Sequence, residues 1–364
     1  MNRIYLPVDI YFGENAIAQS GDNIFNLGHK PMIVTGRQSA KVCGAEEDIT
    51  KLLERLDREF VIYNEVTENP KIETINQGIK YFIESQCDYV IGIGGGSPLD
   101  AAKAIALGAA NHIEGDQLFD TKLHEKCYPI VAIPTTSGTG SEVTQYSVLT
   151  DTKANKKAGF TNPLIFPIVA FVDPKYTISL SQKVTRDTAI DALSHLLEGL
   201  YSNRRNQLIY PMIYDGIKLI VHHLKDLLLH PTNVKLREKI MKASLYGGIV
   251  IAHSGTTLQH SIGYPLTTEF GLSHGLANGV VMKYIMELYY PAIKDELDEL
   301  FLHLGMSKED FYKWLDSLDF SFDMKIHDDF IEDKILEVVQ SRNMANNPFT
   351  VSTTQIKNIY YQFK

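Results

Sequence analysis

Short apolar runs of strand length alternate with amphipathic stretches through the first half of the chain. The six runs are rich in Val and Ile and read RIYLPVDIYFG, KPMIVTG, EFVIYNEV, CDYVIGIGGG, YPIVAIPTT and PIVAFVDP. Between them, residues 40–56, 72–85 and 97–108 carry apolar positions at helical spacing. This alternation predicts an α/β domain with a mostly parallel sheet.

The pattern changes at about Thr185, where β-branched runs disappear and long amphipathic stretches continue to Phe363. Pro211 interrupts one apolar stretch and is expected to begin or kink a helix there. The change falls after a polar segment, SLSQKV, which is typical of a domain boundary. The chain therefore predicts an α/β domain at residues 1–181 and an all-α domain at residues 182–364.

Composition narrows the class of protein without changing this picture. The 364 residues are 44% hydrophobic, which is enough to fill two cores, and the net charge of -9 disfavours binding to nucleic acid or to anionic membranes. Three widely spaced cysteines do not make a disulfide framework. No apolar run reaches the roughly 18 residues that a membrane span needs. We expect a cytoplasmic protein.

A glycine-rich turn joins a predicted strand to a predicted helix in IGIGGGSPLDAAKA. Gly94, Gly95 and Gly96 permit close backbone approach, while Ser97 and Asp100 have the character of an N-cap and a capping box. Such a helix start can bind a pyrophosphate through its free N–H groups. The turn is not a Gly-x-Gly-x-x-Gly fingerprint, so a turn that only connects strand to helix is the alternative.

A second polar loop follows the next predicted strand and reads IPTTSGTGSEVT. Thr135, Thr136 and Thr139 supply hydroxyl groups between bare glycines. Ligands of open α/β sheets bind beyond the carboxyl ends of the strands, so two such loops after successive strands favour a nucleotide-binding cleft over two unrelated turns.

Three histidines and one aspartate form a candidate metal site. Asp191 and His195 are four residues apart and would share one face of a helix. His260 and His274 lie in a later Gly/Ser/Thr-rich region. One carboxylate and three imidazoles suit a divalent metal, and Fe²⁺ or Zn²⁺ is expected although Mn²⁺, Co²⁺ and Ni²⁺ share these ligand types.

The two later histidines are expected on different elements. Pro265 and Gly271 stand between His260 and His274, and both residue types interrupt helices. The two imidazoles can therefore meet only if the chain folds back on itself.

The order of these motifs resembles the iron-containing alcohol dehydrogenase family. The resemblance rests on GGGSPLDAAKA, IPTTSGTGSEVT, DALSHLLEG and HSIGYPLTTEFGLSHG, with FGENA near the start and NNPF near the end. It implies a dinucleotide-binding α/β domain and a helical domain for metal and substrate. By this resemblance the metal ligands are Asp191, His195, His260 and His274, and the cofactor contacts are Gly94, Gly95, Gly96, Ser97, Asp100, Thr135, Thr136, Thr139 and Lys157.

The chain departs from the family pattern at several positions. Many members carry a histidine four residues after the third ligand, where this chain has Tyr264. Tyr264 is therefore a candidate catalytic residue, and the route of the proton past it stays open. Ser181 and Arg186 replace a proline and a small apolar residue, outside the ligand set.

A further departure concerns the cofactor. After the strand MIVTG some members place an acidic residue that binds the adenosine ribose, and here that place is Gly36. Without a carboxylate the site would not repel a 2′-phosphate, and Arg37 or Lys41 can pair with one. We therefore expect NADP(H) in preference to NAD(H).

The resemblance implies an enzyme that transfers hydride between a small alcohol or diol and NADP(H) or NAD(H). Two alternatives stay open at this point. One is a polyol-phosphate dehydrogenase or a dehydroquinate synthase-like enzyme on the same scaffold, and the other is a non-catalytic nucleotide-binding protein with a structural metal. A homodimer or higher homo-oligomer is also expected from the resemblance.

Overall fold

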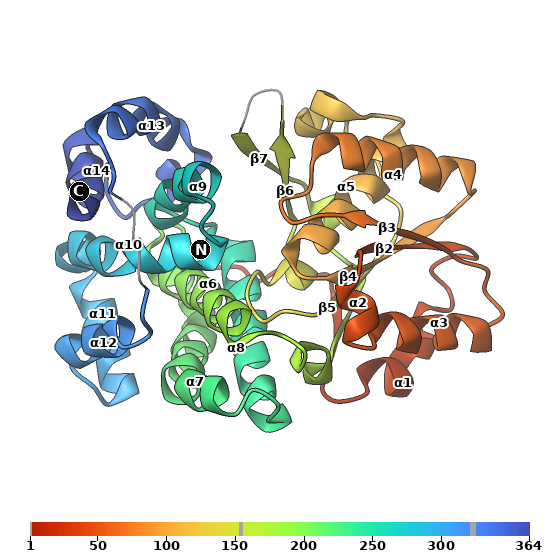
Figure 1. The fold of residues 1–364 in the computed structure, drawn as a ribbon, viewed down its shortest axis with the longest axis horizontal. Helices are drawn as coiled ribbons and strands as arrows, with labels where there is room; N and C mark the ends of the chain where they lie inside the picture. The colour runs from red at the N-terminus through yellow and green to blue at the C-terminus, as the bar shows by residue number, and fades with distance from the viewer. Residues whose placement is uncertain (1, 153–155, 321–324) are drawn as a thin grey trace. The chain divides into compact units, whose positions relative to one another are not determined.

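The computed structural model describes residues 2–152, 156–320 and 325–364. These residues form two compact units, drawn in Figure 1. The α/β unit consists of Leu6–Ser181 and His230–Met241. The helical unit consists of Gln182–Leu229, Lys242–Lys364 and the N-terminal residues as far as Tyr5.

Six strands of the α/β unit form one sheet in the order β1-β8-β5-β4-β2-β3, with every neighbouring pair parallel. The strands are β1 (Asp9–Phe12), β2 (Pro31–Gly36), β3 (Val61–Val66), β4 (Tyr89–Gly94), β5 (Ile130–Pro134) and β8 (Val169–Val172). The predicted parallel sheet is confirmed, and each of its strands comes from one of the six apolar runs.

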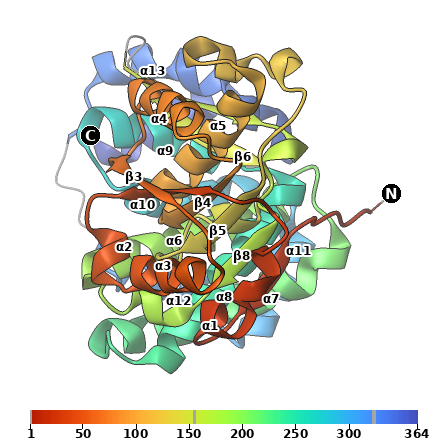
Figure 2. The ribbon, with the colours of Figure 1, turned by 90° about the vertical axis from the view of Figure 1, so that its right-hand side faces the viewer.

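Helices cover both faces of this sheet (Figure 2). They are α1 (Ala16–Ser20), α2 (Ser39–Val42), α3 (Ala45–Arg55), α4 (Ile72–Glu84) and α5 (Gly96–Asn111). Side chains alternate along each strand, so Met32 and Val34 join the core with α4 and α5, whereas Ile33 joins the core with α1 and α3. Continuous apolar runs are thus explained by burial on both faces.

The strand order reverses between β2 and β4. The chain passes from β2 outward to β3, then returns to the other side of β2 and continues through β4 and β5. Such a switch point leaves a crevice at the carboxyl ends of the two strands, where open α/β sheets bind ligands. Gly36 and Gly94 end the two strands at this edge.

Two parts of the α/β unit differ from the prediction. The helix expected over residues 40–56 is divided into α2 and α3, because Gly44 lies between them with a φ of +85°. The antiparallel hairpin of β6 (Tyr146–Asp151) and β7 (Lys156–Thr161) was not predicted. The sequence KKAGFT of β7 lacks the alternation that marks a strand, and its pairing with β6 supplies what the local pattern does not.

The described part of the helical unit contains helices and connecting turns, as predicted. Its helices, together with α8, which begins in the α/β unit, are α6 (Gln182–Tyr201), α7 (Tyr210–Leu229), α8 (Val234–Ser254), α9 (Leu258–Phe270), α10 (His274–Tyr289), α11 (Lys294–Leu304), α12 (Lys308–Asp316), α13 (Asp328–Gln340) and α14 (Thr353–Tyr360). Pro211 is the second residue of α7, and Ser352 caps α14 in a capping box.

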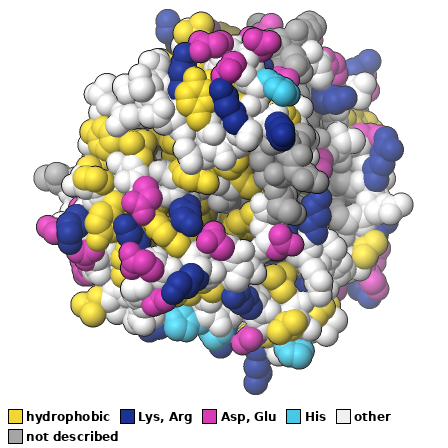
Figure 3. Space-filling view, turned by 60° about the vertical axis from the view of Figure 1, so that its left-hand side comes forward, with side chains coloured by type: hydrophobic (Ala, Val, Ile, Leu, Met, Phe, Trp, Pro, Cys, Tyr) yellow, Lys and Arg dark blue, Asp and Glu magenta, His cyan; other side chains and the backbone are white. Residues whose placement is uncertain are grey.

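Charged side chains of both signs are interspersed on the face drawn in Figure 3. Among the helices of the described residues, none has the length and apolar character to cross a bilayer.

Candidate functional site

The first two candidate ligands lie in a continuous run of buried residues in α6. Asp191 and His195 are separated by one helical turn and are 3% and 4% exposed. Apolar residues of the same helix, including Leu193 and Leu196, are also buried. A carboxylate buried this deeply needs a cation or hydrogen-bond donors, because burial without a partner costs several kcal/mol.

The other two candidates come from α9 and α10. Gly271 has a φ of +65° and ends α9, and α10 begins at His274, so His260 and His274 lie on separate helices as expected. Of the two residues expected to interrupt the helix, Gly271 does so and Pro265 does not. Pro265 does not break α9, which continues through it to Phe270 because the helix is packed along most of its length and tertiary burial outweighs the local cost of proline.

Asp191, His195 and His260 offer ligand atoms that all lie within 4.8 Å of one another, and His274 approaches the same carboxylate. The Oδ1 atom of Asp191 lies 3.8 Å from Nε2 of His195, 3.8 Å from Nε2 of His260 and 3.6 Å from Nε2 of His274. Atoms that bind one divalent ion at about 2.1 Å lie roughly 3 to 4 Å apart, so this donor set fits a metal ion. We call these four residues the ligand cluster: Asp191, His195, His260 and His274.

A glycine allows α10 to reach α6. A Cβ atom on Gly275 would lie 1.7 Å from the backbone oxygen of Asp187 and 3.2 Å from Cβ of Asp191. The first contact, with a backbone atom, is incompatible with a side chain, so only glycine permits this crossing. The crossing brings His274, the preceding residue, to Asp191.

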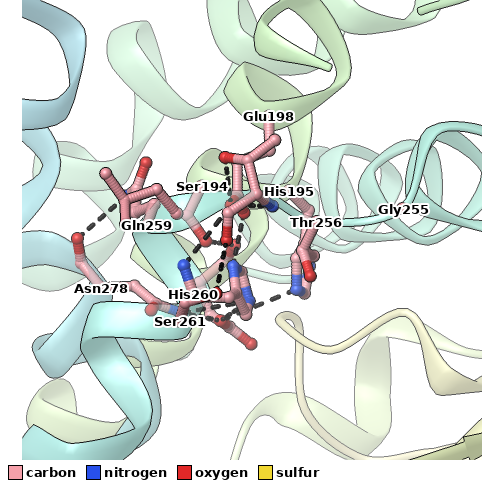
Figure 4. Close-up of polar contacts among 12 residues, drawn as sticks. Ser194, His195, Glu198, Gly255, Thr256, Gln259, His260, Ser261 and Asn278 are labelled. Carbon is pink, nitrogen blue, oxygen red and sulfur yellow. Dashed lines mark hydrogen bonds and ion pairs between the residues drawn. The ribbon is translucent and has the colours of Figure 1, made fainter. Parts of the chain in front are cut away.

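Two residues that the sequence reasoning did not single out contact the ligand cluster (Figure 4). The carboxylate of Glu198 accepts from Nδ1 of His260. The side-chain nitrogen of Asn278 lies 3.1 Å from Oδ1 of Asp191, 3.2 Å from Nε2 of His260 and 3.4 Å from Nε2 of His274. A signal existed for both, since Glu198 is two turns after Asp191 and Asn278 is one turn after His274 on their helices.

The buried carboxylates of the ligand region are held in the ionised form. Burial would raise the pKa of the Asp191 carboxyl, but the histidines and Asn278 outweigh it and lower the pKa. The pKa of Glu198 is lowered in the same way, since its pairing with His260 and Thr257 outweighs burial. Burial alone would lower the pKa of His260, and Glu198 reverses this and raises it. The site is therefore prepared for positive charge.

Tyr264 lies beside the ligand cluster. Its ring stacks on His274, with centroids 5.5 Å apart and an angle of 9° between the planes, and its centroid is 6.2 Å from that of His260. The tyrosine therefore supports a candidate ligand through its ring. This contact does not by itself assign a role to the hydroxyl group.

In the α/β unit, the glycine-rich turn begins α5 differently from the prediction. The helix starts at Gly96 with Gly95 as its N-cap, so Ser97 lies inside the first turn and is not the cap. Asp100 does not complete a capping box, because its carboxylate accepts from Oγ of Ser141 at 2.6 Å and from the backbone N–H of Val148 at 2.9 Å. No side chain of the described residues caps this helix start.

The two polar loops pack against each other. A Cβ atom on Gly95 would lie 3.1 Å from Oγ1 of Thr136, and one on Gly96 would lie 2.8 Å from Cγ2 of Thr139. The backbone N–H of Thr135 also donates to the carbonyl of Gly94 at 2.9 Å. The structure thus brings together the glycines and threonines at the carboxyl ends of β4 and β5.

A buried lysine lies under these loops and was not predicted. Nζ of Lys103 donates to Ser141, Thr144 and the carbonyl of Tyr146 at 2.7, 3.2 and 2.9 Å. Burial lowers the pKa of Lys103 to about 8, against the opposing effect of nearby carboxylates. Burial likewise raises the pKa of Glu142 to about 7. Lys103 thus supports the end of the second polar loop and the first residue of β6.

The remaining cofactor candidates also lie in the α/β unit. Gly36 ends β2, and a Cβ atom there would lie 3.4 Å from the backbone oxygen of Val66, a contact that a small adjustment relieves. Arg37 follows and is paired with Glu65 at 3.7 Å. Lys157 lies on β7, near enough to Asp100 to lower the pKa of that carboxyl against the larger effect of burial.

Comparison with protein families identifies both parts of the chain. The family model described as iron-containing alcohol dehydrogenase matches residues 7–174. The model described as the C-terminal part of the Fe-containing alcohol dehydrogenase family matches residues 185–363. Together the two matches cover nearly the whole chain.

Individual relatives and solved structures agree with these matches. Alcohol dehydrogenase 4 of Saccharomyces cerevisiae is 30% identical over 309 residues, covering 84% of this chain and 81% of that protein. The 1,3-propanediol dehydrogenase of Citrobacter freundii is 32% identical over 282 residues, covering 76% and 72%. A crystal structure of an iron-containing alcohol dehydrogenase from Thermotoga maritima has a TM-score of 0.94 at 36% identity and covers 100% of this chain and 99% of that one.

Proposed function

This chain belongs to the iron-containing alcohol dehydrogenase family, and we propose that its ligand cluster holds the family's metal and its two polar loops hold the nicotinamide cofactor. Metal-dependent alcohol dehydrogenase activity, expected from the resemblance, is confirmed by the family. The family implies iron and a nicotinamide cofactor. The comparisons give no support to Zn²⁺, which the ligand types alone had left open.

One observation carries the metal assignment. Oδ1 of Asp191 lies 3.6 to 3.8 Å from three imidazole Nε2 atoms that reach it from three helices. Asp191, His195, His260 and His274 would hold a divalent metal, which would supply charge to stabilise the alcohol oxygen, and a bound nicotinamide would supply the hydride acceptor. The chain's own part is to fix the donor atoms, because all of them except those of His274 are almost fully buried.

Substituting the ligands tests this assignment. We expect His260→Ala and His274→Ala to lose bound iron and alcohol oxidation together, measured by metal analysis and by NAD(P)H formation. His222→Ala is the matched control, since His222 is an exposed histidine of α7 and should keep both. Full turnover by a variant that holds no metal would refute the assignment.

The proposal for the cofactor concerns the crevice at the carboxyl ends of β2, β4 and β5. The start of α5 has free N–H groups and a positive dipole end, which suit a pyrophosphate. The threonine loop lies against that helix start and offers hydroxyl groups. We therefore assign dinucleotide binding to the domain of residues 1–181 and metal and substrate binding to that of residues 182–364.

We propose a preference for NADP(H) over NAD(H). Gly36 places no carboxylate at the end of β2. Arg37 and Lys41 are exposed, and their ion pairs with Glu65 at 3.7 Å and Glu46 at 3.8 Å are of the weak surface type, so either cation can pair with a 2′-phosphate instead.

The preference can be tested at Gly36 itself. Turnover with equal concentrations of the two cofactors should favour NADPH, and a clear preference for NADH would contradict the proposal. Gly36 does not require a left-handed backbone, so Gly36→Asp adds a charge without strain. We expect Gly36→Asp to lower kcat/KM for NADPH by roughly tenfold, about 1.4 kcal/mol, with a smaller effect on NADH. Gly36→Asn controls for side-chain size.

For the substrate we propose a small or medium primary alcohol or diol. The methanol and 1,3-propanediol dehydrogenases among the relatives support a small alcohol or diol, whereas a long-chain primary alcohol dehydrogenase is also among them, so the relatives do not choose the chain length. A panel of simple alcohols, diols and phosphorylated polyols would test it, and preference for a phosphorylated substrate would contradict it. A cytoplasmic homo-oligomer stays a prediction, and light scattering would measure the oligomer.

A further inference from the structure

Glu198 is a buried carboxylate that the proposed chemistry does not use. Its side chain is fully buried on α6, one turn after His195. One carboxylate oxygen, Oε2, contacts Nδ1 of His260. The other, Oε1, accepts from the backbone N–H of Thr257 at 2.6 Å and from its hydroxyl at 2.8 Å. Every partner of this carboxylate is a donor.

We propose that Glu198 is a positioning residue that fixes the tautomer of His260, with the proton on Nδ1 and the lone pair of Nε2 directed at Asp191. The inference rests on the proposed metal site. A neutral imidazole carries one N–H, and an ionised carboxylate can only accept. The nitrogen that faces Glu198 therefore carries the proton, and the other nitrogen is left free to bind a metal.

The opposite edge of the ring supports the same tautomer. Nε2 of His260 lies 3.2 Å from the side-chain nitrogen of Asn278 and 3.8 Å from Oδ1 of Asp191. An amide nitrogen only donates, so Nε2 acts as an acceptor there. Glu198 and Asn278 thus impose one tautomer from two sides of the ring.

Glu198 also fixes the backbone that carries His260. Its Oε1 atom accepts from the N–H of Thr257, the N-cap of α9, and the N–H of His260 lies 3.4 Å away. The motif NNPF contributes at the same helix end, since Oδ1 of Asn347 accepts from the N–H of Leu258 at 2.9 Å. These contacts hold the helix start and the ring as one unit.

Glu198→Gln separates positioning from simple packing. The amide has almost the same shape, but whichever way it turns, its NH₂ group must face either Nδ1–H of His260 or the donors of Thr257. The imidazole then either changes tautomer or loses its partner. Loss of a group that orients a metal-bound histidine typically weakens metal affinity by about 10- to 100-fold.

The experiment uses Co²⁺ as the probe, titrated into the folded metal-free enzyme in competition with a chelator. We expect Glu198→Gln to weaken Co²⁺ binding by at least about tenfold. Ser202→Ala is the matched control, because Ser202 is a buried polar residue directly after this helix, and its hydroxyl donates to the carbonyl of Ser254 at 2.8 Å. It should bind Co²⁺ as the wild type does.

The tautomer is read directly from the ¹⁵N chemical shifts of histidine in the metal-free enzyme, with His260→Ala used for assignment. In the wild type, Nε2 of His260 should give the shift of an unprotonated nitrogen, and Glu198→Gln should change it. An unchanged shift together with wild-type Co²⁺ affinity would overturn the inference.

Three further variants keep the outcomes distinct. If Glu198→Gln does not fold, Glu198→Asp retains the acceptor and should bind Co²⁺ more tightly than Glu198→Ala, and equal affinities would overturn the inference.

Asp191→Ala tests the metal site itself. If Asp191→Ala binds Co²⁺ like the wild type, the proposed metal site fails too, whereas weak binding by Asp191→Ala with normal binding by Glu198→Gln rejects only the role of Glu198.

Discussion

The helical unit and the α/β unit bury carboxylates with opposite electrostatic results. In the helical unit, burial is outweighed by histidines, and the pKa values of Asp191 and Glu198 are lowered. In the α/β unit, burial raises the pKa values of Asp100 and Glu142 by more than the positive charge of Lys103 lowers them, so both pKa values are raised. The difference lies in the neighbours of each carboxylate, since both pairs are deeply enclosed.

This difference separates a site prepared for a cation from a site that supports a loop. The ligand cluster keeps its carboxylate ionised and places three imidazole Nε2 atoms within 3.8 Å of it, and a metal binds to such atoms when they are unprotonated. The carboxylates beside Lys103 are hydrogen-bonded within the protein, where Asp100 accepts from Ser141 and Val148. Side chains from three helices make the first site, whereas backbone turns and hydroxyl groups make the second.

The largest effect is expected where two helix backbones meet. Gly275→Ala would place a Cβ atom 1.7 Å from the carbonyl oxygen of Asp187, so α10 must move away from α6 and carry His274 with it. A displacement of about 1 Å at a catalytic group can cost roughly 100-fold in rate. We expect iron content and turnover to fall together, measured by metal analysis and kcat.

A glycine outside this crossing provides the control. Gly305 has a φ of +67°, which Asn adopts more readily than other residues with a side chain, so Gly305→Asn should strain the chain only locally and should leave iron content unchanged. Normal iron content in Gly275→Ala would show that the crossing is not what places His274.

The sequence predicted the elements whose patterns are local and missed the contacts that depend on packing. Six strands and the candidate ligands were identified from apolar runs and residue types. The contacts of Glu198 and Asn278 could not be predicted from the sequence, because they depend on which helices face each other. Pro265 misled the prediction in the same way, since burial along α9 outweighs a local preference.

The second prediction concerns stability and pH in the α/β unit. The pKa of Glu142 is about 7 in the folded protein and 4.5 for the ordinary side chain, so between these values the folded state binds more protons than the unfolded state. The free energy of unfolding therefore falls as pH rises through this window, by up to about 3 kcal/mol. Glu142→Gln should remove this dependence, measured by urea unfolding from pH 4.5 to 8.

Asp100 and Lys103 are present in both the wild type and Glu142→Gln. A difference between the two proteins in how the free energy of unfolding depends on pH therefore reports on Glu142. Glu125→Gln changes an exposed glutamate and should keep the wild-type dependence on pH. If Glu142→Gln keeps it as well, the contrast between the two units loses its basis in the α/β unit.

A smaller effect is expected where the two polar loops touch. Gly96→Ala would place a Cβ atom 2.8 Å from the methyl group of Thr139, which can move more easily than a backbone carbonyl. Overpacking of this kind costs about 1 to 3 kcal/mol, so we expect KM for the cofactor to rise roughly tenfold. Iron content should not change. A fall in iron content with unchanged cofactor KM would reverse the roles given to the two units.

The smallest effect is expected at Tyr264, whose ring contacts a candidate ligand. Tyr264→Phe keeps the stacking on His274, so iron affinity should stay unchanged. Tyr264→Ala removes an aromatic contact of about 0.5 to 1.5 kcal/mol and should weaken iron binding by roughly 2- to 10-fold. Positioned proton transfer typically contributes about 10²- to 10⁴-fold to a rate. If Tyr264→Phe lowered kcat by that much with normal iron content, the hydroxyl group would move the proton, and the ligand cluster would include a reacting group beyond its metal donors.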